Sequence, residues 1–223
     1  MKITVGKALD LTHTVRNGMT VYPGDPEPRI ERVKELFRDG VNLTGIEMGA
    51  HTGTHVDAPI HFIEGGAGVD ELPAEQFVGE AVVLDLSHKP PGSAITRDDL
   101  EKYDAQIKEG DIVLLYTGMS RHWDEEWARS NYTYLDAEGA EWLVEKGVKV
   151  VGIDFLSVER YGAEEPKTHR TLLGNGITII ESISSELGRL TGGRILLICL
   201  PLKVEGSDGG PARIIAYPLE GDD

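Results

Sequence analysis

The sequence predicts an α/β domain that contains more strand than helix. Short runs of Val, Ile and Leu recur along the chain, each bounded by Gly, Pro, Asp or charged residues, and such runs are typical of buried strands. No internal repeat, low-complexity tract or Pro/Ser-rich linker divides the chain, so we expect residues 1–223 to form a single domain. The predicted strands are AVVLDL (81–86), DIVLLYT (111–117), VKVVGID (148–154), ITIIE (177–181), RILLICL (194–200) and ARIIAY (212–217).

Two segments between these runs carry the start and stop signals of helices. Thr96 is a predicted N-cap with Asp99 three positions later. The helix that follows places three apolar side chains on one face and stops at a glycine: Leu100, Tyr103 and Ile107, then Gly110. A second helix is predicted from Asp136 to Lys146, with Asp136 as its N-cap and Gly147 as its stop.

Composition and charge exclude several classes of function. With 223 residues and 40% hydrophobic content, the chain can form one domain with a sizeable core. A formal net charge of -16 without a basic stripe argues against nucleic-acid binding, because phosphate contacts need clustered Lys and Arg. No stretch is long enough to span a membrane, and MKITVGKALDL lacks the apolar core of a signal peptide. We expect a cytoplasmic protein without a nucleic-acid or membrane partner.

Nucleophilic catalysis by serine or cysteine has little support in the sequence. The chain lacks a G-x-S-x-G elbow. Its one cysteine, Cys199, lies in the apolar run RILLICL, where a small buried thiol is expected.

The stretch AHTGTHVDAPIHF (50–62) gathers groups that bind metals and transfer protons. Three histidines and an aspartate fall within eleven positions: His51, His55, Asp57 and His61. A glycine, a proline and two threonines argue against a helix, and in an extended chain these odd-numbered residues share one face. Four strand residues span roughly 13 Å, too far for two imidazoles to close on one ion. We therefore expect a bend near Gly53, where the missing side chain leaves room for the ion.

The donor set of this stretch indicates a catalytic metal. His51, His55 and Asp57 supply two neutral nitrogens and an oxygen, which leave a divalent ion such as Zn²⁺ or Mn²⁺ an open position for water. A carboxylate can also bridge, so Asp57 could hold a second ion if further ligands arrive from elsewhere in the fold. The sequence predicts one or two divalent ions per chain.

The segment HTGTHVDAPIH resembles the cyclase family of metal-dependent hydrolases, which includes bacterial kynurenine formamidases and isatin hydrolases. It matches every fixed position of that family's signature, H-x-G-T-H-x-D-x-P-x-H. The resemblance extends over most of the chain, through VYPGDP, VGIDFLSVE, THRTLLGNGITIIES and PLKVEGSDGGPARIIA. It implies a mixed sheet that closes toward a barrel with peripheral helices, in the swivelling β/β/α arrangement, and an obligate homo-oligomer, expected to be a dimer.

The resemblance also implies roles for individual residues. His51, His55 and Asp57 would bind a first metal, Asp57 would bridge to a second, and His169 with Glu181 would complete the second site. His61 would be the acid/base residue. On the residues alone, Glu181 ends an apolar strand and His169 lies in a polar loop ahead of it, so the two can converge on one site.

Tyr22, in VYPGDP, stands where formamidases of this family carry a tryptophan that lines the substrate pocket. Tyr22 is therefore predicted to stack against an aromatic or planar substrate. The alternative is that it packs a rigid proline loop. The segment SDGGPAR lacks the context of a phosphate site and is predicted to form a tight turn.

These observations predict a hydrolase that acts on a small-molecule amide, formamide or strained cyclic amide. A divalent metal activates water and polarises a carbonyl, and His61 can pass a proton to the leaving nitrogen. The resemblance favours the N-formylkynurenine class, although Tyr22 departs from the formamidase pattern. A lactam or isatin-type ring hydrolase and a noncatalytic metal-binding protein are the alternatives. The second of these would have no need for His61.

Overall fold

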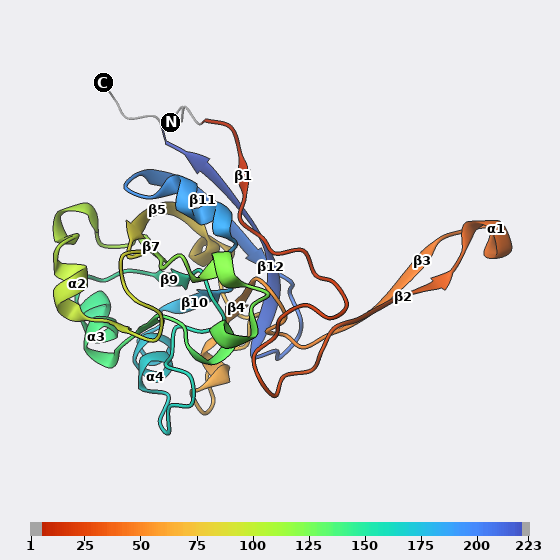
Figure 1. Ribbon diagram of the computed structural model, residues 1–223, viewed down its shortest axis with the longest axis horizontal. Coiled ribbons are helices and arrows are strands. Elements are labelled where there is room, and N and C mark those ends of the chain that lie inside the picture. The colour runs from red at the N-terminus through yellow and green to blue at the C-terminus, as the bar shows by residue number, and fades with distance from the viewer. Residues whose placement is uncertain (1–5, 220–223) are drawn as a thin grey trace.

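The computed structural model describes residues 6–219, and within them eight strands form one mixed sheet that closes on itself (Figure 1). Seven of the eight form a ring, because β12 pairs with both β11 and β4. The eighth, β1, is not part of the ring and pairs with β12 further along that strand, at Ile215 and Ala216. The predicted barrel-like sheet is therefore confirmed. In ring order the strands are β12 (Gly209–Pro218), β11 (Arg194–Pro201), β5 (Val78–Asp85), β7 (Ile112–Tyr116), β9 (Val150–Ile153), β10 (Thr178–Glu181) and β4 (His55–Asp57), and β1 is Leu9–Asp10.

The strands of the ring carry apolar side chains at successive positions, so both faces of the sheet can be buried. The four central strands β5, β7, β9 and β10 run parallel and come from four of the predicted apolar runs. Alternate side chains of these strands point to opposite faces. One apolar cluster contains side chains from all seven ring strands, including Val56 and the buried Cys199, and so fills the interior. A second cluster packs the outer face against the helices.

Three short helices cover that outer face. They are α2 (Arg97–Glu101), α3 (Ala137–Glu145) and α4 (Lys167–Gly174), which contribute Leu100, Leu143 and Leu172 to the outer cluster. The predicted N-caps Thr96 and Asp136 are confirmed, and Thr96 forms a capping box with Asp99. The first helix is shorter than predicted. Tyr103 turns toward the sheet, where its hydroxyl donates to the carbonyl of Asp85 at 2.6 Å, and the chain continues as a 3₁₀ turn.

A two-stranded arm projects from the body (Figure 1). It consists of β2 (Arg29–Lys34), the short helix α1 (Leu36–Asp39) and β3 (Leu43–Glu47), and its strands pair only with each other among the described residues. Phe37 at the tip is 91% exposed. The arm was not predicted from the sequence. The remaining paired strands are the short β6 (Ala94–Ile95) and β8 (Tyr134–Leu135).

Within residues 6–219, no helix has both the length and the apolar character that crossing a membrane requires.

Candidate metal centre

Strand β4 lies at the seam where the ring closes and presents two of the predicted ligands. His55 pairs with Glu181 on β10, and Asp57 pairs with Gly209 on β12. Because Val56 between them points into the barrel interior, His55 and Asp57 point to the opposite face. His55 Nε2 lies 3.2 Å from Asp57 Oδ1 and 3.7 Å from Glu181 Oε2. The strand itself thus places Asp57 beside the imidazole, and its pairing with β10 adds Glu181.

His51 reaches the same place from a turn, so the expectation that the four residues share one strand face is wrong. The strand contains only His55–Asp57, and the chain bends before it at Gly53, whose φ is +67°. The bend near Gly53 is confirmed, but its reason differs from the one expected. A Cβ on Gly53 would lie 3.1 Å from the side chain of Met19, so that space holds protein and no ion. The turn brings His51 Nδ1 to 2.9 Å from Asp57 Oδ1.

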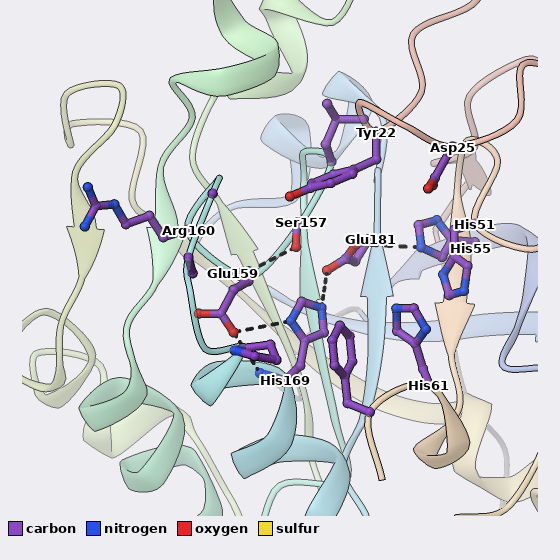
Figure 2. Close-up of a pocket in the computed structure, with 15 residues that line it drawn as sticks. Tyr22, Asp25, His51, His55, His61, Ser157, Glu159, Arg160, His169 and Glu181 are labelled. Carbon is purple, nitrogen blue, oxygen red and sulfur yellow. Dashed lines mark hydrogen bonds and ion pairs between the residues drawn. The ribbon is translucent and has the colours of Figure 1, made fainter. Parts of the chain in front are cut away.

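His169 comes from helix α4 and lies in no loop, which corrects the sequence-based expectation. Pro166 precedes the helix, and the carboxylate of Glu159 accepts from the backbone N–H of Thr168, in its first turn, at 2.9 Å. The buried imidazole directs Nε2 toward Glu181 Oε1 at 3.2 Å and Asp57 Oδ2 at 3.6 Å. Its Nδ1 lies 3.4 Å from Glu159 Oε2. Figure 2 shows His169 between the two glutamates, facing the other histidines.

Asp57 is the common element of the cluster. Two groups of side chains could each hold a metal ion, because the metal-ligating atoms within each group lie within 4.8 Å of one another. One group is His51, Asp57 and His61, and the other is His55, Asp57 and Glu181. This grouping differs from the one the family resemblance implies, which placed His51 and His55 together. A carboxylate that belongs to both groups is suited to bridging two ions.

The cluster fits a divalent ion. Within the described part of the chain, His55 Nε2 and Asp57 Oδ2 are buried and have no hydrogen-bond partner. Buried polar atoms are rarely left unpaired, because the loss of hydration is costly. A cation would satisfy both atoms, and imidazole nitrogens with carboxylate oxygens are ligands that Zn²⁺ and Mn²⁺ accept.

The charges of the cluster are strongly coupled. Burial opposes protonation of His51, but hydrogen bonds to Asp57 and Asp208 outweigh it and raise the pKa of His51 to about 9. Burial likewise opposes protonation of His169, yet Glu159 and Glu181 raise its pKa to about 10. Burial would raise the pKa of Asp57, but the hydrogen bond from His51 and the nearby imidazole of His55 hold it well below its ordinary value. Without an ion, protons on the histidines therefore balance the carboxylates.

His61 lies beside the cluster on a 3₁₀ turn, Pro59–His61, which follows β4 after one residue, Ala58. The proline therefore turns the chain, as predicted. The imidazole stacks on His51 with ring centroids 4.2 Å apart and packs edge-on against Phe62. Burial lowers the pKa of His61, against the charge of Asp57, which raises it. Unlike His51, this imidazole is favoured in its neutral form.

A pocket of about 390 Å³ opens onto these groups. Tyr22 lines it together with His51, His55, His61, His169 and Glu181 (Figure 2). Phe62 is also part of its wall. Tyr22 also packs against a small apolar cluster and lies 6.0 Å, between ring centroids, from Tyr161. It therefore both lines the pocket and packs the loop, and the two interpretations of Tyr22 do not exclude each other.

Two further carboxylates at the site were missed by the sequence analysis. Glu159 contacts His169, and Asp208 contacts His51 and His61. Asp208 belongs to SDGGPAR, which was predicted to be a tight turn. That prediction is wrong for most of the segment, because β12 begins at Gly209. An acid followed by two glycines at the start of an apolar run was the available signal.

The closed mixed sheet and the histidine–carboxylate cluster beside a pocket define a metal-dependent hydrolase. The family model Cyclase ("Putative cyclase") matches residues 9–160. The chain belongs to this family.

Individual relatives agree with the assignment along nearly the whole chain. A kynurenine formamidase from Erythrobacter litoralis is 33% identical over 215 residues, which cover 94% of this chain and 93% of that protein. A solved structure of a predicted metal-dependent hydrolase from Bacillus stearothermophilus is 35% identical, with a TM-score of 0.80 over 95% of this chain and 98% of the other. Isatin hydrolase A from Labrenzia aggregata, bound to benzyl benzoate, is 27% identical, with a TM-score of 0.86 over 96% and 94%. The resemblance drawn from HTGTHVDAPIH is confirmed.

Proposed function

We propose that this protein is a metal-dependent hydrolase of a formamide or lactam C–N bond in a small, planar substrate. The observation that carries the proposal is the convergence of His51, His55 and His169 on the buried carboxylate of Asp57, beside the pocket that His61 lines. The formamidase and isatin hydrolase relatives support this reaction class.

The residues that would hold the metal are His51, His55, Asp57, His169 and Glu181. The membership of Asp57 in both groups of candidate ligands supports two ions, Zn²⁺ or Mn²⁺, each of which would take Asp57 as a ligand. When bound, such an ion lowers the pKa of a coordinated water and polarises the substrate carbonyl.

His61 would carry the proton. Its imidazole accepts a proton from the attacking water and delivers it to the leaving nitrogen as the C–N bond breaks, which requires a group that changes protonation near neutral pH. The lowered pKa of His61 keeps it in the neutral form that can accept this proton. A noncatalytic metal-binding protein would not need this residue at the pocket.

The walls of the pocket suit a flat substrate. Tyr22 and Phe62 line it, and aromatic faces stack well on planar groups. N-formylkynurenine and isatin are the two substrates to which the named relatives point, and both are planar around the scissile bond.

A hydrolysis screen tests the proposed function. Protein reconstituted with Zn²⁺ or Mn²⁺ is offered N-formylkynurenine, isatin and formanilide, with chelator-treated protein as the control. Turnover of the formamides assigns the formamidase class, and turnover of isatin alone assigns the lactam class. If the metal-loaded protein hydrolyses none of them, the proposal for these substrate classes is wrong.

We further propose that the protein is a homodimer in which each arm packs on the second copy. A two-stranded hairpin alone is marginally stable in water, yet this arm exposes a set of apolar side chains that need cover: Val33, Leu36, Phe37, Val41, Leu43 and Ile46. Residues 29–47 carry four basic and four acidic residues, so the arm is neutral although the chain is at -16, and it can approach an acidic copy without net repulsion. Two exchanged arms satisfy a closed two-fold assembly.

Both ends of the arm lie close in the sequence to residues that line the pocket. The arm starts four residues after Asp25, which lines the pocket, and ends four residues before His51.

Light scattering tests the proposed interface. A Leu36→Asp/Phe37→Asp variant should give the mass of a monomer. The control, Trp127→Ser, changes an exposed aromatic residue outside the arm and should leave a dimer. A dimeric arm variant contradicts the proposed interface.

A further inference from the structure

Asp208 contacts two histidines of the site with one oxygen. Its Oδ2 accepts a hydrogen bond from His51 Nε2 at 3.0 Å and lies 3.2 Å from His61 Nδ1. The side chain is 48% exposed at the edge of the site. No other carboxylate among residues 6–219 lies within ion-pair distance of His61.

The fold holds this carboxylate in place. Asp208 immediately precedes β12, which pairs Gly209 with Asp57 on β4. The carbonyl of Asp208 accepts from the backbone N–H of Ala58 at 2.9 Å, in the segment that leads into the turn carrying His61. The backbone of Asp208 is therefore tied to the same segment that carries both Asp57 and His61.

Asp208 differs from the outer partners of the other histidines. The carbonyl of Gly53 lies 2.7 Å from His55 Nδ1 and Glu159 lies 3.4 Å from His169 Nδ1, so each of these acceptors serves one ring. Such partners fix the tautomer and orientation of a ligating histidine. Among residues 6–219, only Asp208 lies within ion-pair distance of both a candidate ligand, His51, and the proposed proton carrier, His61.

We propose that Asp208 is a positioning residue that keeps the proton of neutral His61 on Nδ1 and leaves Nε2 to exchange a proton with the substrate. The inference rests on the proposed function. In the reaction, Nε2 takes the proton of the attacking water and returns it to the leaving nitrogen, while the Nδ1 proton stays on Nδ1.

Kinetics with a matched control test the role. Asp208→Asn should lower kcat by roughly 10- to 100-fold, the usual effect of an outer-shell partner, with KM changed less than about two-fold. Elemental analysis should show unchanged metal content. The control is Asp70→Asn, because Asp70 accepts from Gly206 N–H in the adjoining loop and touches no histidine of the site. It should keep full turnover.

A double variant separates positioning from general damage. If Asp208 acts through His61, Asp208→Asn should cost little additional kcat in a His61→Ala background, since interacting residues are not additive. An equal loss in both backgrounds, a loss of metal together with activity, or full turnover of Asp208→Asn would each overturn the proposal.

A spectroscopic readout makes the inference testable even if the substrate classes are wrong. In zinc-loaded protein labelled with ¹⁵N-histidine, long-range ¹H–¹⁵N correlations identify the tautomer of His61. We expect the Nδ1–H form in the unchanged protein and its loss in Asp208→Asn. An Nε2–H tautomer in the unchanged protein refutes the role of Asp208 without reference to turnover.

Discussion

The backbone of Gly209 lies directly against the imidazole of His51. A Cβ built on Gly209 would sit 2.8 Å from His51 Cε1 and 2.7 Å from the carbonyl oxygen of Val56, and real Cβ atoms do not approach other atoms so closely. The glycine therefore lets β12 pair with β4 while His51 turns toward Asp57.

Gly209→Ala should displace His51 or break the β12–β4 ladder. Overpacking of this kind typically costs about 1–3 kcal/mol of folding free energy. We expect a lower melting temperature and weaker metal binding, measured by thermal unfolding and by titration with Zn²⁺. Gly193→Ala is the matched control, because its Cβ meets nothing closer than 3.6 Å. Equal behaviour of the two variants would mean that the contact with His51 is unimportant.

Asp57→Asn should remove more metal than any other single change, because Asp57 belongs to both candidate groups. His169→Ala should lower the metal content by about one ion per chain and spare the rest, if two ions bind. Elemental analysis after dialysis measures both. A metal content unaffected by Asp57→Asn excludes this site, and one unaffected by His169→Ala removes His169 from it.

Metal binding should release protons and strengthen as pH rises. The pKa values of His51 and His169 in the folded, metal-free protein, about 9 and about 10, exceed the ordinary value of 6.5. Their contribution to the stability of the metal-free protein is complete below about pH 6.5 and is lost as pH rises toward 10. The ion must displace these protons. Calorimetry at pH 7 in two buffers of different ionisation enthalpy should show the release, and identical heats in both buffers would contradict it.

His61→Ala should retain the fold and most of the metal while kcat falls by roughly 10²- to 10⁴-fold, the usual contribution of a positioned acid/base group. Metal analysis and steady-state kinetics on the same sample separate the two effects. If metal and activity are lost together, His61 is a metal ligand. Its position close to His51 and Asp57 is compatible with that outcome.

Tyr22→Ala should raise KM with little change in kcat, because stacking holds substrate and transition state alike. Tyr22→Phe keeps the ring and should behave like the unchanged protein. An unaltered KM with a lower melting temperature would reduce Tyr22 to a packing residue of its loop.

The sequence predicted local features of the site better than long-range ones. His51, His55, Asp57 and His61 lie within eleven residues, so their chemistry is visible in the order of the residues, and Glu181 is marked by the strand that it ends. Asp208 and Glu159 reach the site through strand pairing and helix packing, which no local pattern encodes.

The errors have physical causes of the same kind. Tertiary contacts with Glu159 fix the first turn of α4, so His169 lies in a helix although its neighbours are polar. The arm escaped prediction because both faces of its strands are exposed, and without a buried face there is no alternation of apolar and polar residues to detect.

The position of β4 between β10 and β12 has a consequence for biosynthesis. Both neighbours of this strand lie more than 100 residues further along the chain, so the metal-ligating atoms come together only after those two segments have been synthesised. Pairings between such distant segments form late, since the entropy of closing long loops must first be overcome. A nascent chain therefore lacks the complete site while the ribosome still holds β12, and capture of the ion follows translation of that last strand.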